Sequence, residues 1–329
     1  MARSPLTLAA LAVAAIPGLE VASAAALADD PEYDSAIIET KDERHLLVRV
    51  PRSRSAEERL SKEMLAAQAL TPGARSRLGF AAPAFVGRAR VAPTFAAVME
   101  YPYGESVPLA QIPIEPEGLG YRIGRAIAEI HALPSTVVTD AGLPVGGPHE
   151  ARRAAESVLE RVIATGLLPL AVRGRWEAAI ADADLWQFQP AVIGGGFDSS
   201  SFLSHGDVVL SVVGWQGLSI GDPASDLSWV SQNERVADAV FSGYQSVAGS
   251  GDRRLRHRAA FLSEIAVGRW LLHGIESKDT DIVDDAVEML TTLAERIHGD
   301  MSARIEQQTA PVLTVDEVED LLDRAQKAV

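Results

Sequence analysis

One stretch of the chain, residues 190–226, holds the acidic side chains that are the first candidates for chemistry. It contains Asp198, Asp207, Asp222 and Asp226. A carboxylate beside a reacting hydroxyl can act as a general base, and grouped carboxylates can hold a divalent cation. These acids are therefore candidates for proton transfer or for metal binding.

Several other chemistries are excluded by the residues present. The chain has no cysteine, which excludes disulfides, thiolate zinc sites and cysteine nucleophiles. Its seven histidines show no pair at the helical spacing of metal ligands, which argues against a zinc hydrolase. The run Ser199–Ser201 lacks the G-x-S-x-G pattern of a nucleophile elbow. The run Gly194–Gly196 lacks the G-K-[ST] that follows in a P-loop.

Composition limits the class of protein and its partners. The chain has 329 residues, with 30 Lys and Arg against 45 Asp and Glu, so the formal net charge is −15. Apolar residues make up 47 %, which is typical of a globular protein large enough for two lobes. A surface this acidic repels polyanions, so we exclude nucleic acids and anionic membranes as partners.

The apolar N-terminal segment, residues 6–19, allows two interpretations. With Arg3 before it and Ala22–Ala24 after it, it resembles a secretory signal peptide. Alternatively, Ser4 caps a surface helix that ends at Pro17, and a strand follows.

The elements that must position the candidate residues fall into two groups. Residues 1–103 form a β-rich lobe, with one internal helix at 53–70 and strands near 19–26, 34–40, 45–50, 83–91 and 94–101. Residues 104–329 form a mainly helical lobe, with a β-hairpin near 190–215 and a tail helix near 314–328. In that lobe we expect helices from 117 onward and near 149–165, 171–185, 225–248, 253–273 and 278–298. This order predicts an α+β, protein-kinase-like two-lobe fold.

Five segments in this order resemble the aminoglycoside and macrolide phosphotransferases, a family of small-molecule kinases. They are HLLVRVPR (45–52), SKEMLAAQAL (61–70), FAAVMEYPYGESV (95–107), IGRAIAEIHALP (123–134) and IGDPASDLSWV (220–230). The resemblance covers residues 5–298. Because the N-terminal helix and strand belong to this family's small lobe, it favours the helix over the signal peptide. We expect a cytoplasmic protein.

The resemblance also implies cofactors and the residues that bind them. ATP and Mg²⁺ are the cofactors of the family. Arg49 takes the place of the strand cation that faces the nucleotide phosphates, and Glu63 that of the helix acid that pairs with it. Met99, Glu100 and Tyr101 match the hinge strand, whose backbone meets the adenine.

The chain departs from the family pattern at the catalytic loop. The family sequence H-G-D-x-x-x-x-N supplies a catalytic Asp and a metal-binding Asn, and a second Asp follows 18 residues after the first. Counting back from Trp215 places Gly196 at the catalytic Asp, Ser201 at the Asn and Gly214 at the metal-binding Asp. Gly194 stands at the His. The literal His205-Gly206-Asp207 lies too close to Gly214 and is interpreted as a hairpin turn.

Three functions stay open at this point. The first is a pseudokinase whose ATP binding, if it occurs, is little stimulated by Mg²⁺. The second is an active kinase of a small hydroxylated substrate, such as a cationic aminosugar. Asp198 or Asp207 would then replace the lost base and Asp222 the lost metal ligand, whereas Asp222 and Asp226 are otherwise expected to brace the loop. The third is a non-catalytic scaffold with a small molecule or a protein as partner.

Overall fold

The structure of the protein is a computed structural model that describes residues 3–27 and 30–308. The chain divides into two compact units. The first comprises Met1–Glu156 and Ile180–Ile265, and the second comprises Ser157–Ala179 and Ala266–Val329. All candidate site residues belong to the first unit.

The N-terminal part of the first unit is built on an antiparallel sheet with strand order β1-β2-β3-β5-β4. The strands are β1 (Val21–Ala26), β2 (Tyr33–Thr40), β3 (His45–Pro51), β4 (Phe85–Val91) and β5 (Thr94–Glu100). The sequence predicts all five of them within a few residues. The β-rich lobe is thus confirmed.

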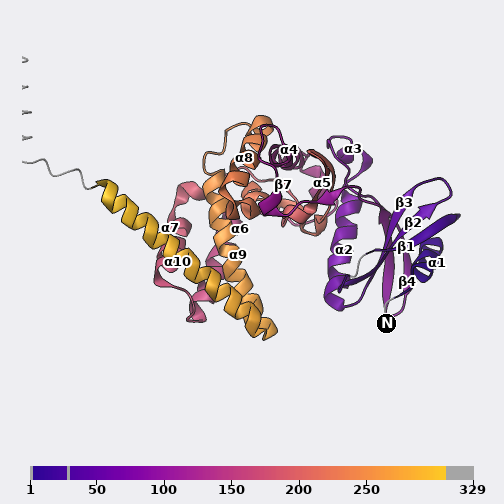
Figure 1. The fold of residues 1–329 in the computed structure, drawn as a ribbon, viewed down its shortest axis with the longest axis horizontal. Coiled ribbons are helices and arrows are strands. Elements are labelled where there is room, and N and C mark those ends of the chain that lie inside the picture. The colour runs from indigo at the N-terminus through magenta and orange to yellow at the C-terminus, as the bar shows by residue number, and fades with distance from the viewer. Residues whose placement is uncertain (1–2, 28–29, 309–329) are drawn as a thin grey trace, which may run out of the picture. The chain divides into compact units, whose positions relative to one another are not determined.

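The two faces of this sheet are covered by different helices, because side chains alternate along each strand. Helix α1 (Pro5–Ala15) packs on one face, against Val48 and Val98 among others. Helix α2 (Arg54–Ala69) packs on the other face, where Ala97 belongs to its apolar cluster. Figure 1 shows the two helices on opposite sides of the sheet.

The N-terminal apolar segment is part of this core. The backbone N–H of Thr7 donates to the Ser4 hydroxyl at 3.2 Å, so Ser4 caps α1 as predicted. Leu8 and Ala12 are buried against the sheet. The helix ends before Gly18, whose φ of +77° suits glycine.

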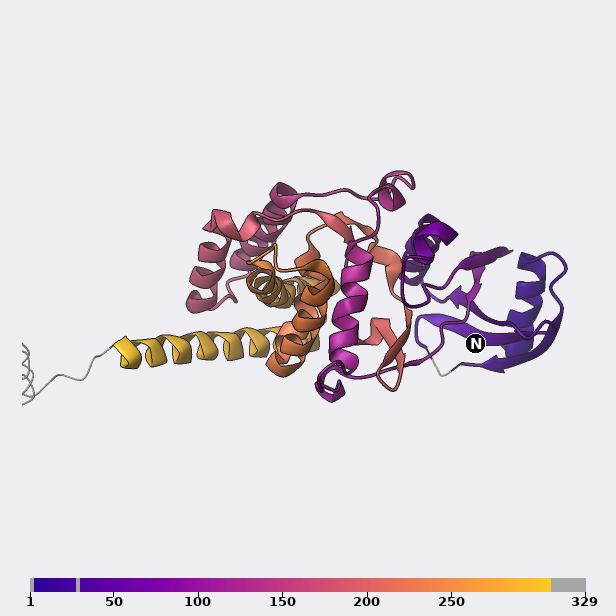
Figure 2. The same cartoon turned by 90° about the horizontal axis from the view of Figure 1, so that it is seen from above.

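Two helices with close backbones form the centre of the helical lobe. These are α4 (Leu119–His131) and α8 (Glu234–Ala248), which lie side by side in Figures 1 and 2. A Cβ on Gly124 would lie 1.9 Å from the Val240 carbonyl oxygen. Glycine is therefore required where these helices meet.

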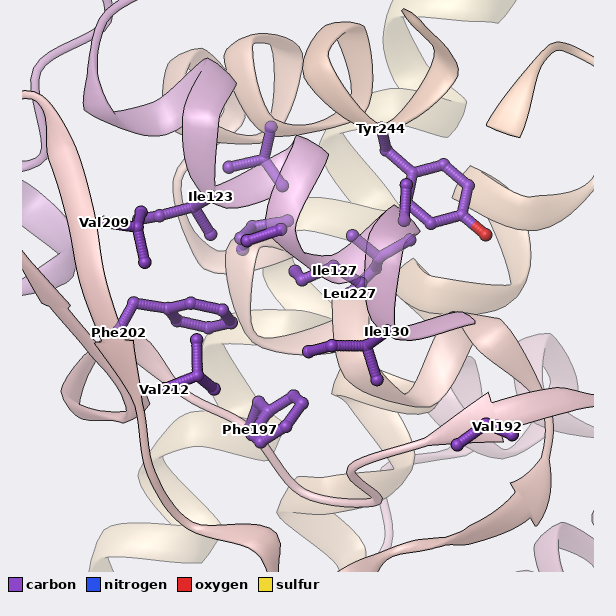
Figure 3. Packing of buried hydrophobic residues seen from close by; sticks show 14 of the residues in the cluster. Ile123, Ile127, Ile130, Val192, Phe197, Phe202, Val209, Val212, Leu227 and Tyr244 are labelled. Atoms are coloured by element: carbon purple, nitrogen blue, oxygen red, sulfur yellow. The ribbon is translucent and has the colours of Figure 1, made fainter. Parts of the chain in front are cut away.

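The apolar core of the helical lobe surrounds α4. Figure 3 shows Ile123, Ile127 and Ile130 in this cluster, with Phe202 at one side and Tyr244 at the other. The isoleucines are spaced at four and three residues, which places them on one face of the helix. They form the apolar stripe by which α4 faces the core.

The β-structure of the helical lobe forms two small sheets. Strands β8 (Phe202–His205) and β9 (Val208–Val212) make a hairpin in which His205 pairs with Val208, and β6 (Glu105–Ser106) pairs with β8. Strand β7 (Ala191–Ile193) does not join this hairpin and pairs instead with β10 (Ser219–Gly221). The loop between β7 and β8 is therefore held by two separate sheets.

The remaining elements within residues 3–27 and 30–308 are helices. The other α-helices are α3 (Pro72–Arg75), α5 (Thr136–Thr139), α6 (Pro148–Ala164), α7 (Leu170–Ala181), α9 (Leu255–Ser277) and α10 (Thr280–Gln308). The 3₁₀ helices are η1 (Leu109–Gln111), η2 (Ala183–Trp186), η3 (Ser199–Ser201), η4 (Trp215–Gly217) and η5 (Pro223–Gln232). In the second unit Trp176 is buried beside Gly268, and Arg161 pairs with Glu276.

The helix expected over 225–248 is two elements in the structure. Helix η5 begins after Asp222, whose carboxylate accepts the N–H of Ala224 at 2.9 Å, and α8 begins after Asn233, whose side chain accepts the N–H of Val236 at 3.3 Å. Each of these side chains caps a new helix, so the chain restarts at Asn233. The tail helix expected at 314–328 lies outside the described residues. None of the helices in the described part of the chain is long and apolar enough to cross a membrane.

Candidate functional site

An ion pair joins strand β3 to helix α2 on the sheet face that α2 covers. Arg49 Nη1 lies 3.5 Å from Glu63 Oε2, and both side chains are largely buried. The Arg49 guanidinium also lies over the Tyr33 ring, 5.4 Å from its centroid. The pair that the sequence predicts between Arg49 and Glu63 is therefore present.

Two polar atoms beside this pair lack partners. Arg49 Nε and Ser35 Oγ are buried and make no hydrogen bond within the described residues. Ser35 is the cross-strand partner of Arg49 in the β2–β3 register, so both residues face the same side of the sheet. A buried polar atom without a partner costs about 1–3 kcal/mol, which a ligand oxygen could recover.

The residues predicted for the hinge lie at the end of strand β5 and just after it. Two of their backbone N–H groups already donate hydrogen bonds within the protein. The Glu100 N–H donates to the Ala84 carbonyl at 2.9 Å, and the Tyr101 N–H donates to the His45 carbonyl at 3.1 Å. Met99 lies opposite Leu47 within the sheet. The N–H groups of Glu100 and Tyr101 are therefore not free, and recognition of a base by these two residues would depend on their carbonyl groups.

The loop after β7 is held by hydrogen bonds to Asp226. The buried Asp226 carboxylate accepts the N–H of Gly194 at 2.7 Å and the N–H of Gly195 at 2.8 Å. Its oxygen also lies 3.3 Å from His131 Nε2, and His131 Nδ1 lies 2.9 Å from the Tyr244 hydroxyl. The bracing role that the sequence predicts for Asp226 is thus confirmed.

An aromatic ring fills the space beside Gly194. A Cβ built on Gly194 would lie 2.0 Å from Cζ of Phe197, so a side chain at 194 and the Phe197 ring cannot coexist. The Phe197 ring is buried and makes edge contacts with Phe202 and Trp215, with centroids 5.6 and 5.3 Å apart. Sequence reasoning missed this residue, because one apolar residue after three glycines carries no signal of where it packs.

Two of the positions that the resemblance assigns to metal binding, Ser201 and Gly214, lie close together in the structure. A Cβ on Gly214 would lie 3.2 Å from the Ser201 hydroxyl oxygen. Gly214 has φ +85° and ψ +33°, a left-handed conformation that Asp and Asn adopt more readily than other side chains. Gly196 has φ +144°, which favours glycine, and open space around it.

Two of the acids proposed to replace the lost catalytic groups, Asp198 and Asp207, have local structural roles. Asp198 caps η3: its carboxylate accepts the N–H of Ser200 at 2.8 Å, and its own N–H donates to Ser201 Oγ at 3.2 Å. Asp207 is exposed in the tight turn between β8 and β9, after Gly206 with φ +57°. The prediction of a hairpin turn at 205–207 is confirmed.

Asp222 belongs to a buried charge cluster. Arg258 is fully buried and donates from Nε to Asp222 at 2.7 Å and from Nη2 to Asp252 at 2.6 Å. Burial acts to lower the pKa of Arg258, but the hydrogen bonds from its guanidinium to Asp252 and Asp222 outweigh it and raise that pKa. Burial is the largest influence on Asp222 and raises the pKa of its carboxyl. The Asp222 oxygens are thus occupied by Arg258 and by the N–H of Ala224.

The fold is the kinase-like fold of phosphotransferase structures. A model of the phosphotransferase enzyme family matches residues 26–262, and the chain belongs to this family. No curated protein sequence matches the chain.

Solved structures of low sequence identity share the fold. The apoenzyme of macrolide 2′-phosphotransferase MphH from Brachybacterium faecium is 20 % identical with a TM-score of 0.70, covering 87 % of this chain and 98 % of that one. The GDP and kanamycin complex of APH(2″)-IIIa is 17 % identical with a TM-score of 0.69, covering 90 % and 99 %. ADP-bound APH(2″)-Ib is 16 % identical with a TM-score of 0.59, covering 82 % and 92 %.

Proposed function

We propose that the protein is a pseudokinase, a family member that transfers phosphate very slowly or not at all. The observation that carries the proposal is the make-up of the site at Gly196, Ser201 and Gly214. Ser201 and Gly214 are neighbours in the structure, and the three residues together offer one hydroxyl and no carboxylate.

The residues present do not fit Mg²⁺. This ion prefers carboxylate and phosphate oxygens in a near-octahedral arrangement. Among the residues that the structure describes, no group of three or more His, Cys, Asp or Glu is placed to hold a metal ion. Of the acids proposed as replacements, Asp222 has both oxygens in use, one toward Ala224 and one toward Arg258, and Asp198 accepts its helix-cap hydrogen bonds on Oδ1.

The rate factors expected for the missing groups support slow phosphate transfer. A general base contributes about 10²–10⁴ in rate, and a metal ion stabilises transition-state charge by several kcal/mol. Each ~1.4 kcal/mol is a factor of ten. A site with neither group would lose more rate than the remaining Ser201 hydroxyl could restore.

Weak nucleotide binding without metal is the second part of the proposal. Arg49 supplies a positive charge, and Arg49 Nε and Ser35 Oγ are buried atoms that a phosphate oxygen could satisfy. Structures of this fold have been solved with GDP and with ADP. A nucleotide ligand also agrees with the cytoplasmic location that the sequence predicts.

The first test measures ATP binding and phosphate transfer by the full chain. We expect calorimetry to give the same weak affinity with Mg²⁺ and with EDTA. We expect no transfer from ATP or GTP to kanamycin or to a macrolide. Affinity that rises strongly with Mg²⁺, or turnover near the 1–100 s⁻¹ typical of kinases, would overturn the proposal in favour of an active kinase. Single Asn variants of Asp198, Asp207 and Asp222 would then locate the carboxylate responsible.

The second test separates the Arg49 site from non-specific binding. Arg49→Met should weaken ATP binding about tenfold, because hydrogen bonds to charged groups contribute about 1.5–3 kcal/mol. Arg90→Met is the matched control, since Arg90 is an exposed arginine on β4 of the same sheet, which β5 separates from β3. Equal affinities of the two variants would remove the nucleotide from the proposal and leave a scaffold.

A further inference from the structure

Besides the candidate site, the helical lobe contains a separate pocket, called here the second pocket. None of the residues assigned to phosphate transfer lines it. Its volume is about 760 Å³, within the ~300–1,000 Å³ range of small-molecule sites. It lies among the last turn of α4, residues 187–191, the last turn of α8 and the loop before α9. Gly196, Ser201 and Gly214 are not among its lining residues.

The walls of this pocket are apolar and aromatic. Phe188, Tyr244 and Leu255 are each more than nine-tenths buried and form part of its lining. The exposed side chains of Gln187 and Gln245 add amide groups around them. This combination of buried aromatic surface with a few polar groups is typical of a site for an organic molecule.

Hydrogen bonds and ring contacts fix these walls in place. The Tyr244 hydroxyl lies 2.9 Å from His131 Nδ1, and the two rings meet edge to face. Arg258 lies over the Phe188 ring, 4.5 Å from its centroid. Arg258 also binds the Leu185 carbonyl at 3.1 Å and the Asp252 carboxylate. A ligand would therefore enter a pocket whose rings need little rearrangement, which reduces the cost of binding.

The charge of the lining selects the kind of ligand. Asp252 is the only carboxylate among the lining residues, and none of those in the described part of the chain is Lys or Arg. The chain as a whole carries −15. The Asp252 carboxylate is paired with Arg258, but Asp222 shares the same arginine, so this cluster carries a formal net charge of −1 beside the pocket. Aromatic faces attract cations, whereas an anion would meet this net negative charge.

We propose that this pocket binds an organic cation with a flat apolar body, about the size of three fused rings. The ring system would lie between the Phe188 and Tyr244 walls, with its positive charge toward Asp252. The proposal concerns a site separate from the Arg49 region, so it does not depend on the proposed pseudokinase function.

Two probes of equal ring size test the charge preference. They are 9-aminoacridine, a cation at pH 7, and 9-anthracenecarboxylate, an anion, and both are followed by fluorescence on the full chain. We expect saturable binding of the cation and at least tenfold weaker binding of the anion. Equal affinities, or no saturable binding of the cation, would overturn the proposal.

Variants of exposed residues locate the binding. Ala132 lines the pocket and is exposed, so Ala132→Trp should fill the space and weaken the cation at least tenfold. Ala154→Trp is the matched control on the exposed face of α6 and should change nothing. Unaltered binding by Ala132→Trp, or an equal loss in both variants, would place the probe elsewhere.

A charge-reversal pair then tests the electrostatic argument without touching the buried cluster. Gln245→Glu should strengthen binding of 9-aminoacridine about threefold to tenfold, and Gln245→Lys should weaken it by a similar factor. Circular dichroism confirms that each variant is folded. The same affinity in both variants would contradict the proposal.

Discussion

At the scale of single residues, the acids of this protein differ mainly in the cations that surround them. Asp34 is buried and accepts hydrogen bonds from Arg3 Nη1 and Arg52 Nε, both at 2.8 Å. Burial alone would raise the pKa of Asp34, but the hydrogen bonds from the two arginines outweigh it and hold that pKa below its ordinary value of 3.8. The ionised form is therefore the one that the fold stabilises.

This pKa shift predicts how stability depends on pH. A lowered folded-state pKa contributes stability above pH 3.8, and that stability is lost as the pH falls through the folded value. We expect Asp34→Asn to lower the free energy of unfolding by about 2 kcal/mol at pH 7, since the lost bonds join charged groups. In urea unfolding at pH 7, 5, 4 and 3, the gap between the two proteins should shrink below pH 4. Asp207→Asn, in an exposed turn, is the control without a gap. A gap of constant size from pH 7 to pH 3 would contradict the assignment.

At the scale of elements, the loop after β7 is organised around glycine and one aromatic ring. Gly194 has no room for a side chain because Phe197 occupies it, and the N–H groups of Gly194 and Gly195 are fixed by Asp226. The same Asp226 contacts His131, which lines the second pocket. The loop is thus held by the packing of Phe197 and by the hydrogen bonds to Asp226.

A double-mutant cycle tests this packing. Gly194→Ala should cost about 1–3 kcal/mol of stability through overcrowding, and Phe197→Leu should cost a similar amount through a cavity. Combined, they should cost less than their sum by at least ~1 kcal/mol, because the smaller ring site accepts the new methyl group. Gly146→Ala is the control, since its Cβ would meet only ordinary contacts at 3.7 Å and should add independently to Phe197→Leu. Strict additivity of the Gly194 pair in denaturant unfolding would show that the ring does not fill that space.

The elements also show where sequence reasoning succeeds and where it stops. The five-stranded sheet and the α4 stripe follow from local periodicity, and the Arg49–Glu63 pair follows from a family resemblance. The pairing of β7 with β10 does not follow, because strands of three residues carry no period. The Arg258 cluster joins residues that are 36 positions apart, with no local signal. Both failures concern long-range contacts that only the folded chain brings together.

At the scale of the whole molecule, the net charge of −15 opposes compactness more than exposed ion pairs support it. Pairs such as Lys41–Glu20 and Arg54–Glu58 are largely exposed, and pairs of this kind contribute about 0–1 kcal/mol each. Salt weakens both effects, since the screening length falls from ~30 Å at 0.01 M to ~10 Å at 0.1 M. Repulsion summed over the whole surface acts at longer range than an ion pair, so screening should relieve repulsion first.

We therefore expect added salt to stabilise the protein. Between 0.01 and 0.3 M NaCl at pH 7, the melting temperature should rise by roughly 2–4 °C, which corresponds to about 1 kcal/mol. Potassium chloride should produce the same rise, because screening depends on ionic strength and not on the identity of the cation. A rise with NaCl alone would indicate a specific sodium site. A fall with both salts would mean that the ion pairs stabilise the fold more than the net charge destabilises it. The acidic surface would then cost the fold less stability than the charge implies, which leaves ligand selection as its role.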